Sequence, residues 1–133
     1  MENICHRYEC EVAFSDTDAS GWVHFTKILN YAEQAEHGYL RKLGIPVFRP
    51  DKGGWPRVKV RCDYKLPLTF QDKIEVRLAL RKVGEKSITW KFEIAKANGQ
   101  IAAIGEMVTV KVNETGEAET ISVTESKLLE GGE

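Results

Sequence analysis

The chain contains five segments in which apolar and polar residues alternate, but only one long amphipathic helical segment. Alternation with a period of two is typical of a strand that buries one face against a core. The expected strands are residues 7–15, 57–66, 72–83, 87–97 and 101–112. Antiparallel strands of this kind need their apolar faces covered, and only one helix is available for the whole sheet. We therefore expect an α+β fold in which a curved antiparallel sheet of about five strands wraps around one long central helix.

The single helix is expected between Phe25 and Leu43. Apolar residues recur three or four positions apart along one face of this segment, and polar residues occupy the other face. Gly44 can adopt the left-handed conformation that ends a helix, and Pro46 cannot continue one. Glu36 falls within the apolar stripe, where a carboxylate needs an ionic or hydrogen-bonding partner that the sequence does not identify.

Length and composition fit one globular domain over residues 1–133. The 133 residues include 42% hydrophobic and 29% charged residues, as in ordinary folded proteins. Asn98-Gly99 predicts a type I′ hairpin turn between the last two strands. The polar C-terminal tail is expected to be disordered from about residue 126. Exposed sheet edges favour association with further copies, so we expect a homodimer or homotetramer.

The charge balance, the lengths of the apolar stretches and the cysteine spacing argue against nucleic-acid binding, membrane insertion and a structural zinc site. Nineteen basic and 20 acidic residues give a net charge of −1, which provides no general attraction for nucleic acid or an anionic membrane. No apolar stretch approaches the roughly 20 residues of a membrane span, and the N-terminus lacks the apolar core of a signal peptide. Cys5, Cys10 and Cys62 lack C-x-x-C spacing, which favours a reduced, cytoplasmic setting. Residue types alone would allow a zinc site with His6, but the paired spacing of structural zinc ligands is missing.

Residues 14–25, FSDTDASGWVHF, place two carboxylates on a short loop directly before the helix. Acidic and hydroxyl residues at such positions commonly form turns and helix caps, so Asp16 and Asp18 could be purely structural. One of them could instead take part in chemistry. The sequence pattern alone leaves both interpretations open.

The longer segment FSDTDASGWVHFTKILNYAEQA resembles the loop-and-helix signature of the hotdog-fold acyl-CoA thioesterases. The similarity is to the 4-hydroxybenzoyl-CoA thioesterase type, a group that includes the Tol–Pal-associated enzymes. It continues through DYKLPLTFQDKIEV, residues 63–76, and covers about residues 8–112. The resemblance implies a hotdog fold and hydrolysis of an acyl-CoA thioester to free acid and coenzyme A, without a metal or redox cofactor.

The resemblance also implies roles for individual residues. Asp18 is expected to be the general base or nucleophile, and the backbone N–H of Phe25 is expected to polarise the thioester carbonyl. Asp16 is then expected to brace the loop. Glu33 is an alternative acid, because another hotdog branch uses a glutamate about two turns into the helix. His24 is a candidate helper, because many Tol–Pal relatives carry a histidine where this chain has Phe25.

Substrate-binding residues follow from the chemistry of coenzyme A, whose phosphates require cationic partners. The first candidates lie in one strand-to-strand turn: Arg81, Lys82, Lys86 and Ser87. A second candidate is the stripe Arg57, Lys59, Arg61 and Lys65, although either set could simply be a solvated face. The aromatic side chains expected to line an acyl pocket are Trp22, Trp55 and Tyr64. Aromatic and aliphatic acyl groups both remain open, as do a non-catalytic acyl-thioester binding module and an acyl-carrier-protein hydrolase.

Overall fold

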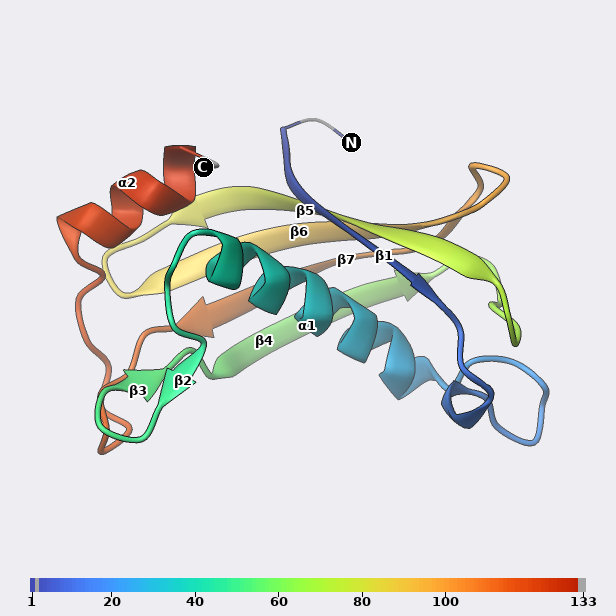
Figure 1. The fold of residues 1–133 in the computed structure, drawn as a ribbon, viewed down its shortest axis with the longest axis horizontal. Helices are drawn as coiled ribbons and strands as arrows, with labels where there is room; N and C mark the ends of the chain where they lie inside the picture. Colours follow the sequence, from blue (N-terminus) through green and yellow to red (C-terminus); the bar gives the residue numbers. More distant parts are fainter. Residues whose placement is uncertain (2, 132–133) are drawn as a thin grey trace.

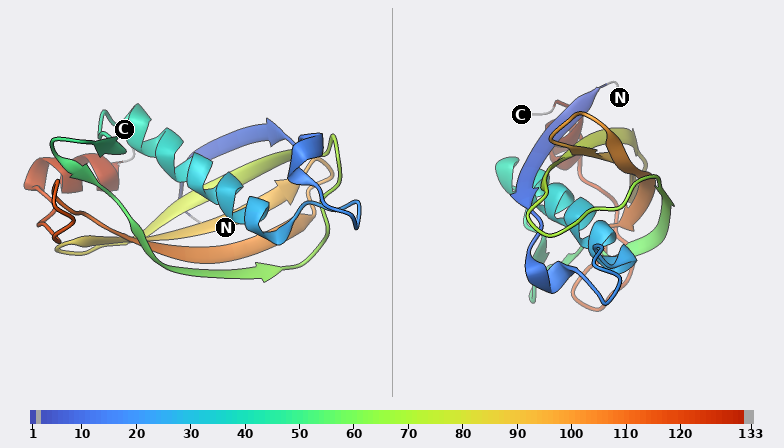
Figure 2. Two further views of the ribbon diagram at one scale, coloured as in Figure 1. Left: turned by 90° about the horizontal axis from the view of Figure 1, so that it is seen from below. Right: turned by 90° about the vertical axis from the view of Figure 1, so that its right-hand side faces the viewer.

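In the computed structural model, which describes residues 1 and 3–131, a five-stranded antiparallel sheet curves around one long helix (Figure 1). The strands lie in the order β1-β5-β6-β7-β4. Their bounds are Ile4–Glu11 (β1), Arg57–Tyr64 (β4), Lys73–Val83 (β5), Ser87–Lys96 (β6) and Ile101–Val110 (β7). Helix α1 (Phe25–Lys42) crosses the concave face, as the end-on view shows (Figure 2). The predicted α+β architecture is confirmed.

Helix α1 ends where the glycine and proline signals predicted. Gly44 has a φ of +76°, which a side chain would disfavour. The N–H of Gly44 donates to the carbonyl of Arg41 at 3.0 Å, and the N–H of Ile45 donates to the carbonyl of Leu40 at 2.9 Å. This pair of bonds is the Schellman motif, which satisfies the last helical carbonyls.

The core lies between α1 and the concave face of the sheet. Large buried side chains from β5 and β6, including Trp90 and Phe92, pack under the helix. The ring of Trp90 meets Tyr39 of α1 edge to face at 6.0 Å, and its Nε1 donates to the buried hydroxyl of Thr109. Gly105 of β7 makes room for Phe92, because a Cβ at this position would lie 2.4 Å from the Phe92 ring.

Three local predictions differ from the structure. Strand β1 ends at Glu11, and residues Phe14–Asp16 form a short 3₁₀ turn (η1) in place of the predicted strand end. The expected loop at 45–56 contains a small hairpin, β2 (Phe48–Arg49) and β3 (Gly53–Gly54). In the β6–β7 turn only Gly99 has a positive φ, so the turn is not type I′, which requires positive φ at both central residues.

The expectation of disorder from about residue 126 is wrong for residues 126–131, while 132–133 lie outside the described residues. The chain forms helix α2 (Val123–Gly131), and Leu129 is only 1% exposed. Tyr39 of α1 donates a hydrogen bond to the Leu129 carbonyl at 2.6 Å. Ser122 and Glu125 cap the helix reciprocally, each donating its backbone N–H to the other's side chain. A few buried apolar contacts thus order a segment whose composition is mostly polar.

None of the helices in the described part of the chain is long and apolar enough to cross a membrane.

Candidate active site

The loop that carries Asp18 forms a tight turn beside the start of α1. Thr17 and Val23 are bridged in antiparallel fashion, and the Gly21 N–H donates to the Asp18 carbonyl at 2.9 Å. Gly21 has a φ of +86°, which allows the chain to reverse at this point. A bridge between Trp22 and Thr69 fastens the outer side of the turn to the segment before β5. The turn therefore presents Asp18 at an exposed corner of the molecule.

The Asp18 carboxylate is held by its own turn. Oδ1 accepts hydrogen bonds from the hydroxyl and from the backbone N–H of Ser20, the latter at 2.8 Å. These two bonds, with a smaller contribution from His24, hold the pKa of Asp18 below its ordinary value. Oδ2 accepts no hydrogen bond from any of the described residues. The loop thus offers an ionised carboxylate with one free oxygen.

Helix α1 begins with an unclaimed backbone donor. His24 is the N-cap residue: its Nδ1 accepts the Thr26 N–H at 3.3 Å and lies 2.7 Å from the Thr26 hydroxyl. The Lys27 N–H donates to the His24 carbonyl at 2.8 Å. The Phe25 N–H makes no hydrogen bond within the described part of the chain, and it lies at the positive end of the helix dipole. The predicted oxyanion donor is therefore free to bind a carbonyl oxygen.

Aromatic rings and an apolar hollow adjoin this donor. The His24 ring stacks on Phe25 with centroids 4.7 Å apart, and Phe25 meets Tyr64 of β4 edge to face at 6.4 Å. The Tyr64 hydroxyl donates to the Phe25 carbonyl at 3.1 Å. A cavity of about 320 Å³ opens here, lined by Trp22, Val23, Phe25, Ile28, Tyr64, Lys65, Leu66, Pro67 and Leu68. Of the predicted acyl-pocket residues, Trp22 and Tyr64 therefore lie beside the helix start.

Asp16 links the loop to the helix, as the sequence predicted for a bracing residue. Its Oδ2 accepts the Ala13 N–H at 3.1 Å and the Tyr31 hydroxyl at 2.7 Å. Its carbonyl accepts the His24 N–H at 2.9 Å. Tyr31 was not among the predicted site residues, although its place three residues after Ile28 and four before Ala35 puts it on the buried side of the helix. A tyrosine in that stripe is a signal that its hydroxyl needs a partner.

Glu33 lies away from the helix start and is part of an ion-pair cluster. Arg57 of β4 donates to Glu33 Oε2 at 3.1 Å and to Glu36 Oε1 at 2.5 Å. Glu36 is fully buried, and its Oε2 has no partner in the described part of the chain. Burial raises the pKa of Glu36 even though Arg57 opposes the shift. Arg57 was predicted to lie in a stripe that either binds phosphates or faces solvent, but a register shift between Arg57 and Lys59 turns its side chain inward.

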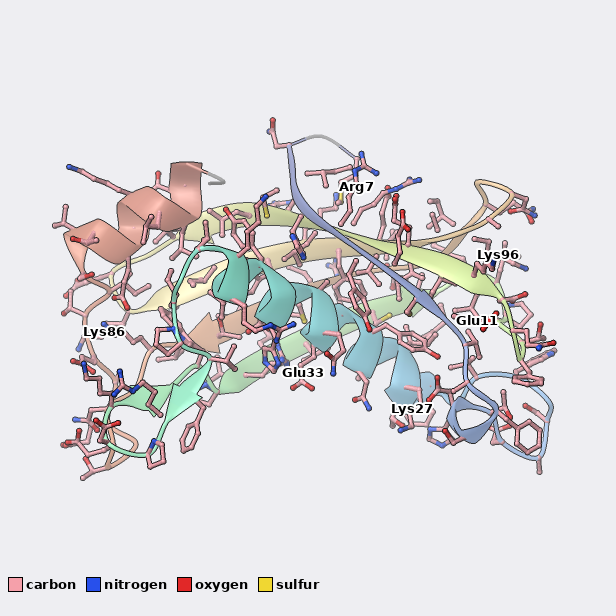
Figure 3. All side chains as sticks on the ribbon, viewed as in Figure 1. Arg7, Glu11, Lys27, Glu33, Lys86 and Lys96 are labelled. Atoms are coloured by element: carbon pink, nitrogen blue, oxygen red, sulfur yellow. The ribbon has the colours of Figure 1, made fainter. Side chains whose placement is uncertain are left out.

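The basic turn predicted to bind phosphates lies at the other end of the molecule. Its residues surround the β5–β6 connection, where Figure 3 labels Lys86, whereas Lys27 marks the start of α1. The 18-residue helix between these ends is roughly 26 Å long. Within one chain, the structure therefore does not bring Arg81, Lys82, Lys86 and Ser87 to Asp18.

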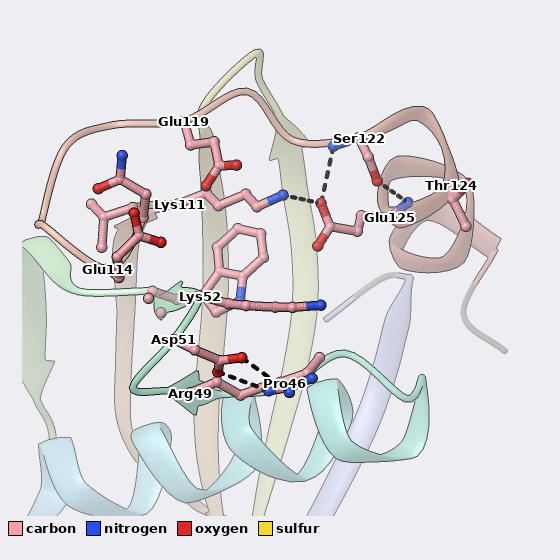
Figure 4. A pocket seen from close by; sticks show the side chains of 15 residues that line it. Pro46, Arg49, Asp51, Lys52, Lys111, Glu114, Glu119, Ser122, Thr124 and Glu125 are labelled. Carbon is pink, nitrogen blue, oxygen red and sulfur yellow. Dashed lines mark hydrogen bonds and ion pairs between the residues drawn. The ribbon is translucent and has the colours of Figure 1, made fainter.

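A cavity of about 650 Å³ also lies far from Asp18, between the β2–β3 hairpin and the segment before α2 (Figure 4). Trp55 lines this cavity and not the hollow beside the helix start, which corrects its expected place in an acyl pocket. The cavity holds charges of both signs, and Lys111 pairs with Glu125 at 2.6 Å. Within the described residues, no three His, Cys, Asp or Glu side chains are grouped to hold a metal ion.

Comparison with known proteins supplies an independent line of evidence. A family model described as the thioesterase-like superfamily matches residues 12–126. A 1,4-dihydroxy-2-naphthoyl-CoA hydrolase of Synechococcus sp. (strain CC9605) is 30% identical over 102 residues, which cover 71% of this chain and 68% of that protein.

Solved structures share the fold. A gentisyl-coenzyme A thioesterase has a TM-score of 0.82 at 29% identity, with 89% of this chain and 97% of that chain covered. An aspartate-to-asparagine variant of 4-hydroxybenzoyl-CoA thioesterase, in complex with 4-hydroxybenzoyl-CoA, has a TM-score of 0.83 and covers 92% of this chain and 96% of that one. At 16% identity this second likeness concerns the fold alone.

Proposed function

The chain belongs to the thioesterase-like superfamily and is a hotdog-fold thioester hydrolase, and we propose that it hydrolyses an acyl-coenzyme A thioester to a free acid and coenzyme A. The observation that carries this proposal is that one short loop ends in both groups that the reaction needs. Asp18 offers an ionised carboxylate with a free Oδ2, and the start of α1 offers an unclaimed Phe25 N–H beside an apolar hollow.

The proposed mechanism uses these two groups directly. The thioester carbonyl oxygen accepts the Phe25 N–H, so the negative charge that develops on this oxygen is stabilised by the amide and the helix dipole. Asp18 either removes a proton from the attacking water or attacks the carbonyl carbon itself. The tetrahedral intermediate then collapses, the carbon–sulfur bond breaks, and coenzyme A leaves as the thiol after taking up a proton. With Asp18 as general base this step releases the free acid directly. With Asp18 as nucleophile the acyl group remains on Asp18 as an anhydride, which water then hydrolyses to the free acid and the regenerated carboxylate. Both routes require the ionised form of Asp18.

An aromatic acyl group is the preferred substrate in this proposal. The rings of Trp22, Phe25 and Tyr64 line the hollow beside the oxyanion donor, and aromatic rings pack well against one another. The similar proteins named above act on naphthoyl and gentisyl thioesters, which supports the same class here. The hollow's lining is predominantly apolar, so it suits an aryl ring better than a charged acyl chain.

A homodimer formed through strand β4 is the second part of the proposal. β4 is an edge strand of the sheet, and Val58, Val60 and Tyr64 along it are exposed. An uncovered edge with apolar side chains favours pairing with a second copy. Two-fold pairing along β4 would reverse the partner, so that the partner's basic β5–β6 turn lies at the same end as this chain's helix start. Such an arrangement would explain why Arg81 and Lys82 lie far from Asp18 within one chain.

The test is a hydrolysis panel of aromatic and aliphatic acyl-CoAs together with the corresponding acyl-carrier-protein thioesters, with release of free thiol as the measurement. We expect the fastest turnover with an aryl-CoA and a loss of at least about a hundredfold in kcat for Asp18→Asn. Asp51 is an exposed aspartate in the β2–β3 connection, so Asp51→Asn is the matched control and should retain activity.

Each alternative predicts a different result. Tight acyl-CoA binding without turnover across the panel would indicate a non-catalytic acyl-thioester binding module. Turnover of the carrier-protein thioesters alone would indicate an acyl-carrier-protein hydrolase. Full activity of Asp18→Asn together with loss in Glu33→Gln would move the catalytic role to Glu33.

A further inference from the structure

The position of Asp18 relative to helix α1 depends on the loop backbone, because its side chain makes no hydrogen bond to the described residues of the helix. Within the described residues the Asp18 carboxylate accepts hydrogen bonds only from Ser20, which belongs to the same turn. Hydrolysis needs the acid and the Phe25 N–H in a fixed geometry, and a displacement of about 1 Å can cost on the order of a hundredfold in rate. Whatever holds the loop on the helix therefore affects the rate directly.

Asp16 joins the two sides of the loop at the end nearest the helix, beyond the Thr17–Val23 bridge. Its carbonyl accepts the N–H of His24, the residue directly before Phe25, at 2.9 Å. Its Oδ2 accepts the Ala13 N–H at 3.1 Å and closes the η1 turn. Asp16 also precedes Asp18 by only two residues. It thus joins the segment that carries the acid to the segment that carries the amide.

Tyr31 fastens this point to the body of the helix. It lies six residues after Phe25 and is only 7% exposed, and its hydroxyl donates to Asp16 Oδ2 at 2.7 Å. A hydrogen bond to a carboxylate is stronger than one between neutral groups. Burial and the bond to Asp16 raise the pKa of the Tyr31 phenol well above its ordinary value, so the hydroxyl remains a donor throughout the working pH range.

We propose that Tyr31 is a positioning residue for thioester hydrolysis, and this rests on the proposed function of Asp18. Its hydroxyl, acting through Asp16, holds Asp18 at the correct separation from the Phe25 N–H. Tyr31 itself touches neither the substrate nor the attacking water. A purely structural hydroxyl would contribute to stability without this selective effect on turnover.

Tyr39 offers a matched control on the same helix. Its hydroxyl also makes a buried hydrogen bond, to the Leu129 carbonyl at 2.6 Å, but near the opposite end of α1. Tyr31→Phe and Tyr39→Phe each remove one oxygen atom and leave the ring in place. Both should lower the melting temperature, because Tyr31→Phe leaves the half-buried Asp16 carboxylate without that donor and Tyr39→Phe does the same to the buried Leu129 carbonyl.

The kinetic results should separate the two variants. For Tyr31→Phe we expect kcat to fall on the order of tenfold while KM stays within about twofold, because the loss lies in the alignment of the reacting groups. For Tyr39→Phe we expect an unchanged kcat on the same acyl-CoA. In the Asp18→Asn background, Tyr31→Phe should have no further effect on the residual rate, because the group that it positions is absent.

The outcomes distinguish this inference from the proposed function. Full activity of Asp18→Asn would overturn the assignment of Asp18, and the positioning role of Tyr31 with it. A strong loss in Asp18→Asn combined with normal kcat in Tyr31→Phe would overturn only the positioning role. An equal loss of kcat in Tyr31→Phe and Tyr39→Phe would show that general destabilisation causes the effect, and it would also overturn the positioning role.

Discussion

Arg57 Nη1 lies 2.5 Å from Glu36 Oε1 and so joins edge strand β4 to the middle of helix α1. The other end of the same guanidinium bonds Glu33 Oε2 at 3.1 Å. This contact supplies the partner that the apolar stripe of α1 requires at Glu36. Glu36 is fully buried, so the Arg57–Glu36 ion pair occupies a place in the core where two apolar side chains could otherwise pack.

Removal of Arg57 should destabilise the protein strongly. Arg57→Ala leaves the Glu36 carboxylate buried without its cation, and such a loss costs about 3–5 kcal/mol near neutral pH. The free energy of unfolding from urea denaturation is the measurement. Arg49→Ala is the matched control, because the Arg49–Asp51 pair is exposed and should change stability by less than about 1 kcal/mol.

A double variant provides a second test of the buried ion pair. Glu36→Leu combined with Arg57→Met removes both charges and should regain most of the stability that Arg57→Ala loses. If Arg57→Ala unfolds at the same urea concentration as the wild type, the buried pair does not contribute as argued.

The stability contributed by Glu36 should depend on pH in a defined direction. Burial raises the pKa of Glu36 above its ordinary value of 4.5 in the folded protein, so the protonated form is the better tolerated one. Its contribution is therefore fully present below about pH 4.5 and decreases as the pH rises through the folded-state pKa. We expect the wild type to lose stability relative to Glu36→Gln as the pH rises from 4 to 8. An unchanged difference in unfolding free energy over this range would contradict the shift.

The strands and the long helix could be predicted from sequence because their signals are local. Alternation over β5 and β6 and the three-to-four spacing in α1 each reflect one buried face. The orientation of Arg57 could not be predicted in this way. A register shift beside it places its side chain on the helix side of the sheet, and simple alternation assigns it to solvent.

The candidate site likewise contains parts that local sequence predicts and parts that depend on distant residues. The Asp18 turn and the Phe25 helix start are contiguous in sequence, so one short motif contains both. Tyr31 was missed because its role depends on Asp16, 15 residues earlier. The distance of Arg81 from Asp18 follows from topology: β5 begins beside the loop and runs away from it for 11 residues, roughly 33 Å.

Ser20 should set the acid limb of the pH–activity profile. Its hydroxyl makes the larger contribution to holding the pKa of Asp18 below the ordinary value, and the backbone N–H makes the second. Ser20→Ala removes the first of these bonds, so the pKa of Asp18 should rise. Because the ionised form is the active one, the acid limb of kcat/KM should move to higher pH. Ser20→Thr retains a hydroxyl and is the control; an acid limb that stays in place in Ser20→Ala would contradict the role of Ser20.

Strand β4 should mediate dimer formation through its exposed valines. Val58 is 61% exposed and lies on the uncovered edge, so Val58→Lys places a charge where a second copy would pack. We expect sedimentation velocity to give a dimer for the wild type and a monomer for Val58→Lys. Val123→Lys, at another strongly exposed valine in α2, is the control and should remain a dimer. A wild-type monomer would overturn the dimer, and a dimeric Val58→Lys would place the interface elsewhere.

The same variant also tests whether the partner supplies the basic turn. If it does, dissociation should raise KM for acyl-CoA more than it lowers kcat. The phosphates would lose their cations, while Asp18 and the Phe25 N–H stay in place.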